Sequence, residues 1–262
     1  MLRSCMAGMA ALFIMELASL QQASAQEWRC DVDDYVTKAI GIEEPWIENA
    51  GYLFSQLSNN KPGALTLAPE IEGRLSDRLG LELDLPAYTE NNPLGQGSNA
   101  LGPLAAGLKV AAVHTCNMGQ GKATLLTIEV EGQYWADRRP DVLPGAGNAI
   151  TVQAMGAQLW YPWFMQGEAG YTQRVGSGVA SGWFVNTSLG KAISTVYAAQ
   201  LEIELDRQLV QADGHGGLEG YAMPQIAYHA PPWLLALGEQ AAFQQGDPHT
   251  QWSTWVMVER EF

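Results

Sequence analysis

The chain has 262 residues, with 28 acidic against 14 basic ones and a formal net charge of −14. Charged residues make up only 16% of it, where an average soluble protein has about 25%. This balance disfavours a nucleic-acid partner, because phosphate binding needs clustered lysine and arginine. An acidic interior or acidic loops would instead favour cations.

Residues 1–25 have the pattern of a secretory signal peptide. Arg3 precedes an apolar run over about 6–20, and the small residues of 23–25 stand where signal peptidase cleaves. We therefore predict cleavage after residue 25 and export of the chain. Glu16 interrupts the apolar run, which leaves a membrane anchor as the alternative.

Residues 26–46 are predicted to form a periplasmic N-terminal segment, in which 31–41 has the one helix-like apolar stripe of the chain. Two cysteines follow the cleavage site, Cys30 in this segment and Cys116 near a short turn. Both lie on the periplasmic side of the topology predicted below, in a compartment where disulfides persist. We expect a disulfide between them, with two free thiols as the alternative.

The segment 70–85 predicts a β-hairpin whose two faces differ in chemistry. Strand side chains alternate between faces, so Glu70 and Glu72 share one face of the first strand. In the second strand the leucines occupy one face, and Glu82 and Asp84 occupy the other. In a soluble sandwich or lipocalin the leucine face would point inward. In a membrane barrel it would face lipid, and the acids would line the lumen.

Similar alternation, bounded by glycine, proline, asparagine or aspartate, continues to the C-terminus. About twelve strands are predicted, at 47–57, 70–75, 79–85, 105–113, 126–135, 150–161, 163–173, 182–190, 198–206, 223–230, 233–240 and 252–262. Short connections at 76–77, 117–121, 161–163, 190–191 and 230–232 alternate with mostly longer ones, notably 86–103, 136–148 and 208–218. Such alternation is typical of a transmembrane barrel with tight periplasmic turns.

Aromatic residues gather near the predicted strand ends, as in the interfacial girdles of membrane proteins: Tyr88, Tyr134, Trp160, Trp163, Trp183, Trp233 and Trp252. The export signal, the long strands and the terminal Phe262 favour the same interpretation. We predict an all-β, antiparallel up-and-down transmembrane β-barrel over residues 47–262, in the outer membrane of a Gram-negative cell and in contact with its lipid. A soluble exported β-protein that binds a ligand is the alternative.

The segments LTLAPEIEGRLSDRLGLELDLPAY (65–88), GPLAAGLKVA (102–111) and WFVNTSLGKAIS (183–194) resemble bacterial outer-membrane transporter-like barrels of the phenol-degradation MetA-pathway type. The resemblance covers most of the chain from about residue 47, and its motifs are hairpin patterns. It implies an outer-membrane barrel that acts as a channel for small solutes, including hydrophobic or aromatic compounds.

The C-terminal strand resembles the outer-membrane assembly signal, which implies the barrel-assembly machinery as a partner. Phe262 is the terminal aromatic residue, and Val258 and Val256 are the alternating apolar residues before it. Arg260 departs from the pattern, and at the periplasmic rim its side chain can reach the phosphates of the lipid headgroups.

Inward positions of the predicted barrel are mostly acidic: Glu70, Glu72, Arg74, Glu82, Asp84, Lys109, Glu129, Glu131, Glu202, Glu204 and Asp206. In a wet lumen these carboxylates would favour passing cations. The alternative is a structural barrel whose lumen is plugged by hydrogen-bonded side chains.

We expect no cofactor, no metal and no enzymatic activity. The four histidines, His114, His215, His229 and His249, lack the spacing typical of a metal site. Ser188 and His229 could in principle face each other across strands, but no nucleophile motif marks them.

Overall fold

A computed structural model of the chain describes residues 36–58, 64–90, 100–117, 120–135, 148–175, 181–208, 217–245 and 250–262. Among these residues no helix is long and apolar enough to cross a bilayer. The strands are β1 (Ala50–Ser58), β2 (Leu65–Ser76), β3 (Leu79–Asp84), β4 (Tyr88–Glu90), β5 (Ala100–Leu101), β6 (Leu104–Asn117), β7 (Lys122–Tyr134), β8 (Asn148–Trp160), β9 (Trp163–Val175), β10 (Gly182–Ala192), β11 (Tyr197–Gln208), β12 (Leu218–Ala230), β13 (Trp233–Gln244) and β14 (Gln251–Glu261).

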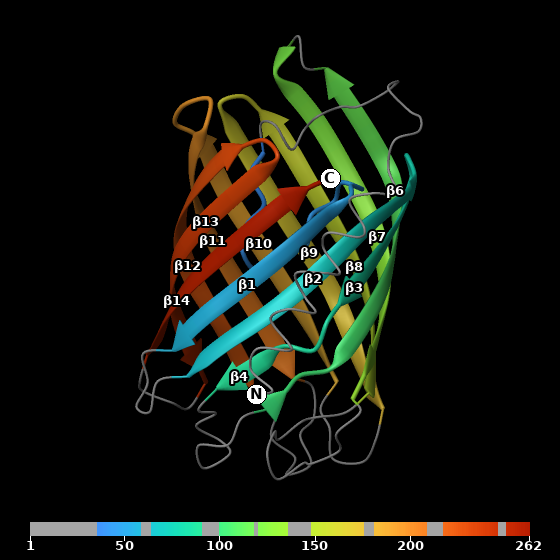
Figure 1. The fold of residues 1–262 in the computed structure, drawn as a ribbon, viewed down its shortest axis with the longest axis vertical. Helices are drawn as coiled ribbons and strands as arrows, with labels where there is room; N and C mark the ends of the chain where they lie inside the picture. Colours follow the sequence, from blue (N-terminus) through green and yellow to red (C-terminus); the bar gives the residue numbers. More distant parts are fainter. Residues whose placement is uncertain are drawn as a thin grey trace, which may run out of the picture.

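Twelve of these strands form a closed antiparallel barrel, which confirms the predicted fold class. Each pairs with its neighbour in the chain, and β1 closes the barrel by pairing with both β14 and β2 (Figure 1). The short β4 and β5 extend the sheet beside β2, within the connection between β3 and β6. Closure leaves the twelve long strands without a free edge, as the interior of a bilayer requires.

The two ends of the barrel differ in their connections. At one end, which we call the turn end, the connections are short: 77–78, 118–121, 161–162, 193–196 and 231–232. The other end, called the loop end, has the longer connections. The predicted turn at 190–191 is wrong, because Lys191 and Ala192 still pair with Ala199 and Ala198 in the β10–β11 ladder. In outer-membrane barrels the short turns lie on the periplasmic side.

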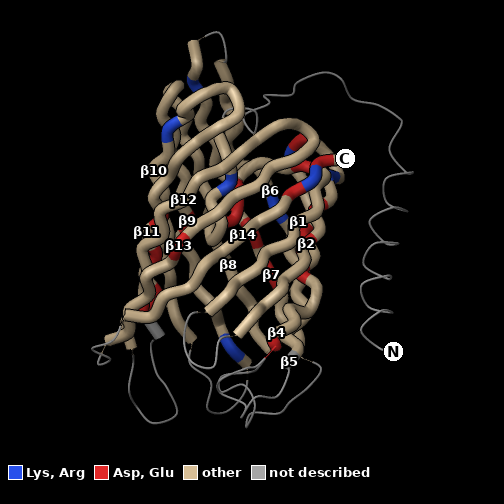
Figure 2. Tube along the Cα trace, turned by 60° about the vertical axis from the view of Figure 1, so that its left-hand side comes forward, with Lys and Arg blue, Asp and Glu red and all other residues tan. Residues whose placement is uncertain are grey.

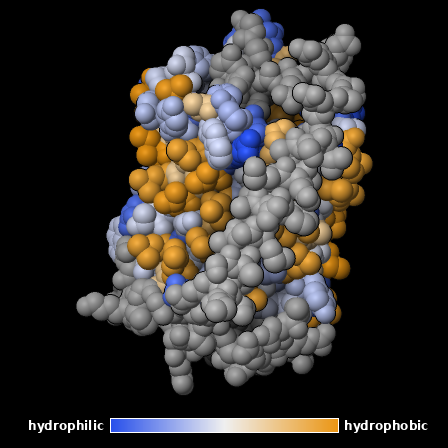
Figure 3. All heavy atoms as spheres, viewed as in Figure 1, coloured by the Kyte–Doolittle hydropathy of each residue, from blue (hydrophilic) through white to orange (hydrophobic). Residues whose placement is uncertain are grey.

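The outward positions of the strands are apolar. In β13, for example, Leu235 and Leu237 are 43% and 50% exposed, while Leu234 and Ala236 between them are buried. Figure 3 shows apolar side chains around the middle of the barrel on the face that it presents. A soluble protein would not cover its surface with such a belt, so the leucine side of each ribbon faces lipid and the chain is an outer-membrane barrel.

Aromatic side chains border this belt at both ends. The predicted girdle residues Trp160, Trp163 and Trp233 are exposed at the turn end. At the loop end, Tyr134 and Trp252 are exposed. Aromatic rings at these two depths are typical of the interfaces between lipid headgroups and acyl chains.

Inside the barrel, the turn-end half and the loop-end half differ. Towards the turn end many inward side chains are buried and apolar, with Leu159 and Phe164 at 0% exposure. Towards the loop end, inward residues such as Thr172, Glu204 and Asp206 remain partly exposed. Figure 2 marks the charged positions, most of them acidic, along the strands. The turn-end half is therefore filled, and in the loop-end half, which we call the vestibule, inward side chains remain partly exposed.

Candidate functional site

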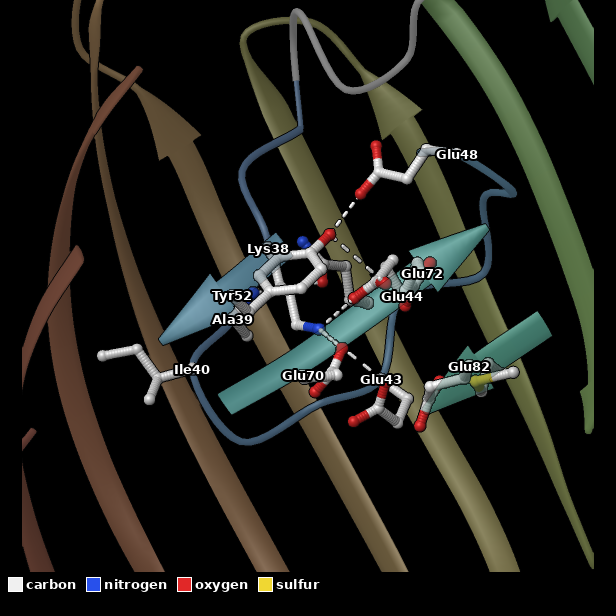
Figure 4. A network of polar contacts seen from close by, with 12 residues as sticks. Lys38, Ala39, Ile40, Glu43, Glu44, Glu48, Tyr52, Glu70, Glu72 and Glu82 are labelled. Atoms are coloured by element: carbon white, nitrogen blue, oxygen red, sulfur yellow. Dashed lines mark hydrogen bonds and ion pairs between the residues drawn. The ribbon is translucent and has the colours of Figure 1, made fainter. Parts of the chain in front are cut away.

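The filled half of the lumen contains a loop of the chain itself, residues 36–49, which we call the lumen loop (Figure 4). Val36 and Trp46, near its two ends, pack in one apolar cluster with Phe164 and Leu159 at the turn end. Its middle, around Gly41, lies deeper in the lumen, beside Glu202. The chain thus enters from the turn end, turns back inside the barrel and leaves to begin β1.

This position differs from the predicted periplasmic segment, of which 36–46 is the described part. Nor do residues 36–41 form a helix. The physical reason is that the apolar side chains need burial, and Ile40 finds it in a second cluster with Tyr52 and Met223. The barrel in turn carries inward polar groups that would otherwise lack partners. Residues 1–35, including the predicted signal peptide, lie outside the described residues.

Three glutamines on different strands bind the backbone of the incoming arm of the lumen loop. They are Gln166 on β9, Gln200 on β11 and Gln225 on β12. The Ala39 N–H donates to Gln166 Oε1 at 3.3 Å, and the Ile40 N–H donates to Gln225 Oε1 at 3.1 Å. The Gln200 Nε2 donates to the Lys38 carbonyl at 3.0 Å. Side-chain amides thus supply the backbone bonds that a strand or helix would normally provide.

The turn of the lumen loop is held by charged and polar side chains. The Gly41 N–H donates to Glu202 Oε2 at 3.1 Å, and its carbonyl accepts from Asn186 Nδ2 at 2.9 Å. A Cβ atom on Gly41 would overlap Tyr221 Oη and Glu202 Oε1, so the close approach here needs glycine. Beyond the turn, the Glu43 N–H donates to Glu168 Oε2 at 2.9 Å.

Two fully buried lysines, each 1% exposed, organise the carboxylates around the returning arm. Lys109 on β6 lies 2.5 Å from Glu72 and 2.6 Å from Glu82, both on the barrel wall, and 3.3 Å from Glu44 of the loop. Lys38 pairs with Glu44 as well. Glu44 therefore links the lysine of the loop to the lysine of the wall.

The same cluster continues to β1 and β2. Lys38 Nζ lies 3.4 Å from Glu70 Oε1 and 4.0 Å from the centre of the Tyr52 ring. The two lysines are in contact with the carboxylates of Glu43, Glu44, Glu70, Glu72 and Glu82, and Figure 4 shows these carboxylates with Lys38. Because these charges are taken out of water, their mutual contacts must replace hydration.

The contacts within the cluster shift the pKa values of two side chains of the lumen loop, Glu44 and Lys38. Burial alone would raise the pKa of the Glu44 carboxyl, but Lys109 and Lys38 together hold that pKa well below its ordinary value. Burial alone would lower the pKa of the Lys38 ammonium, but the surrounding glutamates raise it above its ordinary value. Both groups are therefore charged at neutral pH, and the loop is held by ion pairs.

The structure places the predicted lumen residues on inward positions and at different depths. The buried ones are Glu70, Glu72, Glu82, Lys109, Glu129 and Glu202, and the partly exposed ones are Asp84, Glu131, Glu204 and Asp206. Arg74 differs, because its guanidinium pairs with Asp77 in the adjacent turn rather than with the cluster. The predicted set thus divides between the filled half, the vestibule and the rim.

Sequence reasoning missed the residues that close the lumen. It assigned no role to Lys38, Glu43 and Glu44, or to the inward glutamines. The available signal was the amides at strand positions in register with the predicted acids, such as Gln200 two residues before Glu202. Ser188 and His229 are not joined in the structure, since Ser188 bonds Gln200 and His229 faces Glu261.

Cys116 lies at the turn end of β6 and is disulfide-bonded. Cys30, its expected partner, lies outside the described residues. The pairing of Cys30 with Cys116 stays a prediction.

Comparison with known proteins gives matches among solved structures. No protein-family model and no curated protein sequence matches the chain. The KdgM porin is similar with a TM-score of 0.53 at 9% identity, over 81% of this chain and 99% of that one. The KdgM porin in complex with disordered oligogalacturonate gives 0.52 at 9% identity over the same shares. OpdK of Pseudomonas aeruginosa with vanillate gives 0.45 at 9% identity, over 76% of this chain and 56% of that one. The chain shares with the KdgM porin the fold of an outer-membrane porin barrel.

Proposed function

We propose that the chain is an outer-membrane channel for small solutes, which the lumen loop closes in this structure. The observation that carries the proposal is how the loop is seated. Its backbone bonds to side-chain amides and carboxylates, including Gln166, Gln225 and Glu202, and it adds no strand to the sheet. When the loop leaves, these wall groups can exchange their bonds for bonds to water, so the emptied lumen would be polar and wet.

The charge of the lumen supports a preference for cations. Beyond the lumen loop, the vestibule carries Glu131, Glu204 and Asp206, and carboxylates in a confined lumen attract cations and repel anions. The KdgM porin binds oligogalacturonate, a chain of acidic sugars. We infer that the protein described here, by contrast, passes positively charged solutes.

The solute class is narrowed further by an inward aromatic side chain. Phe184 lies in the loop-end half of β10, partly exposed, near the depth of Asp206, its partner across the β10–β11 ladder. A carboxylate beside an aromatic ring suits a small organic cation with apolar or aromatic parts. Such a solute agrees with the aromatic compounds that the resemblance to the phenol-degradation MetA-pathway type implies. That resemblance stays a prediction.

Current through planar bilayers tests the channel. We would compare the wild type with a triple variant, Gln166→Ala, Gln200→Ala and Gln225→Ala, which removes the amides that hold the loop. Each lost hydrogen bond weakens the seat by about 0.5–1.5 kcal/mol. We therefore expect the mean current to rise by about tenfold or more, with a reversal potential that shows cation preference.

The matched control replaces two lumen amides that bond the wall instead of the loop. Gln56 donates to Ser253, and Gln240 accepts from Ser253 and Trp255. The variant Gln56→Ala with Gln240→Ala should leave the current unchanged. The rival function is a structural barrel with a permanently plugged lumen, which the filled turn-end half favours. No current from the folded triple variant would reject the channel and support that rival.

We propose that the C-terminus is read by the barrel-assembly machinery. Val256 and Val258 face outward on β14, as the assembly pattern requires, and Arg260 lies over the Trp233 ring at the turn end. Deleting Phe262 should lower the amount of barrel in the outer membrane, measured by fractionation and heat-modifiable gel mobility. Equal amounts of folded barrel would contradict the proposal.

We propose that the disulfide of Cys116 is made with Cys30, within the exported chain. Because Cys30 precedes the lumen loop by a few residues, such a bond would fix the incoming arm at the turn end. The variant Cys30→Ser should expose one free thiol and change mobility on non-reducing gels. The same number of free thiols in Cys30→Ser and in the wild type would contradict the proposed disulfide.

A further inference from the structure

Three carboxylates on adjacent strands converge beside the lysine cluster. One oxygen from each of Glu70, Glu82 and Asp84 lies within 4.8 Å of the others. The β2–β3 ladder brings them together, because it places Glu70 opposite Asp84, with Glu82 two residues earlier on the same face. Oxygens bound to a calcium ion at 2.3–2.6 Å are separated by distances of this order.

A fourth carboxylate, that of Glu129, reaches across β6 towards Glu82 and has an oxygen without a hydrogen-bond partner. Glu129 on β7 is 0% exposed, and its Oε2 accepts from Gln153 at 2.8 Å. Its Oε1 has no hydrogen-bond partner among the residues that the structure describes. An unpaired buried carboxylate oxygen is costly, so this atom calls for a ligand.

Gly107 leaves room for that oxygen beside Glu82. Gly107 lies on β6 between β3 and β7, opposite Glu82. Glu129 Oε1 occupies the position that a Cβ atom on Gly107 would take, and the Cβ of Glu82 is 3.5 Å from that position. The absent side chain thus lets Glu129 reach across β6 to the side of Glu82.

The lysines balance these charges only in part. Lys38 contacts Glu70 and Lys109 contacts Glu82, but both lysines also contact Glu43 and Glu44. Among the described ion pairs, none joins a lysine or arginine to Asp84 or Glu129. By formal charge, the carboxylates around this group therefore outnumber its two lysines, at a depth where a bare carboxylate is poorly solvated.

We propose that Glu70, Glu82, Asp84 and Glu129 bind one hard divalent cation, of which Ca²⁺ fits best, inside the barrel wall beside the lumen loop. Carboxylate oxygens alone suit Ca²⁺ and Mg²⁺ rather than zinc or copper. The irregular set from three strands suits the flexible coordination of Ca²⁺ better than the octahedron of Mg²⁺. The site holds whether or not the loop ever leaves the lumen.

Calorimetric titration of the folded, detergent-solubilised chain tests the site. After treatment with a chelator, CaCl₂ and MgCl₂ are titrated separately into the wild type and into the double variant Asp84→Asn, Glu129→Gln. These two positions are chosen because neither has a described ion pair with a lysine. We expect one Ca²⁺ per chain, weaker Mg²⁺ binding, and at least tenfold weaker Ca²⁺ binding in the variant.

The matched control is Asp206→Asn with Glu219→Gln, two vestibule acids on β11 and β12. It should bind Ca²⁺ like the wild type. Absence of saturable Ca²⁺ binding, or equal loss in both double variants, would overturn the site. If the double variant does not give the heat-modifiable folded form, Asp84→Asn alone takes its place under the same criteria. Because binding is measured on the closed chain, its failure would leave the channel proposal standing, and absence of current would leave the site standing.

Discussion

The two halves of the lumen use the same wall for different purposes. In the turn-end half, apolar residues such as Phe164 and Leu159 pack against Val36 and Trp46 of the lumen loop, as in the core of a soluble protein. In the loop-end half, Glu204 and Asp206 stand on the same strand faces but remain partly exposed. One barrel thus has a closely packed base and, towards its other end, inward carboxylates that remain partly exposed.

The difference shows where closure is stabilised. At the boundary between the halves, Lys109 and Glu44 join the loop to the wall by ion pairs. Towards the turn end, apolar packing adds to the binding of the lumen loop. Towards the loop end, the carboxylates are partly exposed and contribute charge. The same type of substitution should therefore change the free energy of unfolding by different amounts in the two halves.

The largest effect is expected at the boundary, from Lys109→Met. The change keeps the apolar volume but leaves Glu72 and Glu82 without their buried cation, which costs up to about 5 kcal/mol. Urea unfolding in lipid vesicles, followed by tryptophan fluorescence, measures the free energy of unfolding. The control Lys191→Met removes an exposed lysine that lies over Trp163 at the rim. Equal losses from both variants would show that Lys109 does not organise the lumen.

Next comes a matched pair of phenylalanines. Phe164 and Phe184 both point inward, and each ring lies against a glycine of the neighbouring strand, Gly190 and Gly170. Phe164 is 0% exposed in the filled half, so Phe164→Ala should cost about 3–4 kcal/mol in the same unfolding measurement.

The effect of Phe184→Ala should be clearly smaller, because the ring is only partly buried and water can enter the space it leaves. If the two variants lose the same free energy, the vestibule is as closely packed as the base. The division of the lumen into halves would then fail.

Much of the barrel could be predicted from the sequence because strand alternation is a local property. Each membrane strand repeats apolar and polar positions with period two, and the short turns carry glycine, proline or aspartate. The main error in the turns, at 190–191, arose because Gly190 was taken to end a strand. In the structure Gly190 lies in the ladder opposite Phe164 and Gln200.

The lumen loop could not be predicted in the same way, because nothing local marks a segment that fills a barrel. The short helix-like stripe of 31–41 predicts a helix rather than an irregular loop, and the residues that follow to 46 mix apolar and charged side chains. Their partners, such as Gln166 and Glu202, lie 127 and 161 residues further along the chain. The carboxylate group of Glu70, Glu82, Asp84 and Glu129 likewise assembles only when the four strands β2, β3, β6 and β7 pair, since its spacing matches no metal motif.

A smaller effect separates two glutamates on one strand. Glu202 is 0% exposed, accepts from Gln225 at 2.5 Å and binds the turn of the lumen loop, whereas Glu204 lies in the vestibule. In Glu202→Gln one carboxylate oxygen becomes an NH₂ group, which faces the groups that donate hydrogen bonds to Glu202, such as Gln225 and the Gly41 N–H. The variant should therefore lose about 1–3 kcal/mol of unfolding free energy. Glu204→Gln should change it by less than about 0.5 kcal/mol. A reversed order would place the boundary between the halves at a different depth.

The smallest change tests whether the loop is the mobile part of the closed half. In Gly41→Ala the added methyl group meets Tyr221 and Glu202, and crowding at a packed site costs about 1–3 kcal/mol. Because only side chains of β11 and β12 share this contact, and not the hydrogen bonds between the strands, the cost should appear as local opening of the loop rather than as global unfolding. Hydrogen exchange of residues 36–49, read by mass spectrometry, should speed up by about tenfold while the strands keep their protection. Gly73→Ala is the control, since a Cβ there meets nothing within 4 Å. If exchange quickens equally in loop and strands, the loop is part of the barrel's rigid core and cannot serve as its gate.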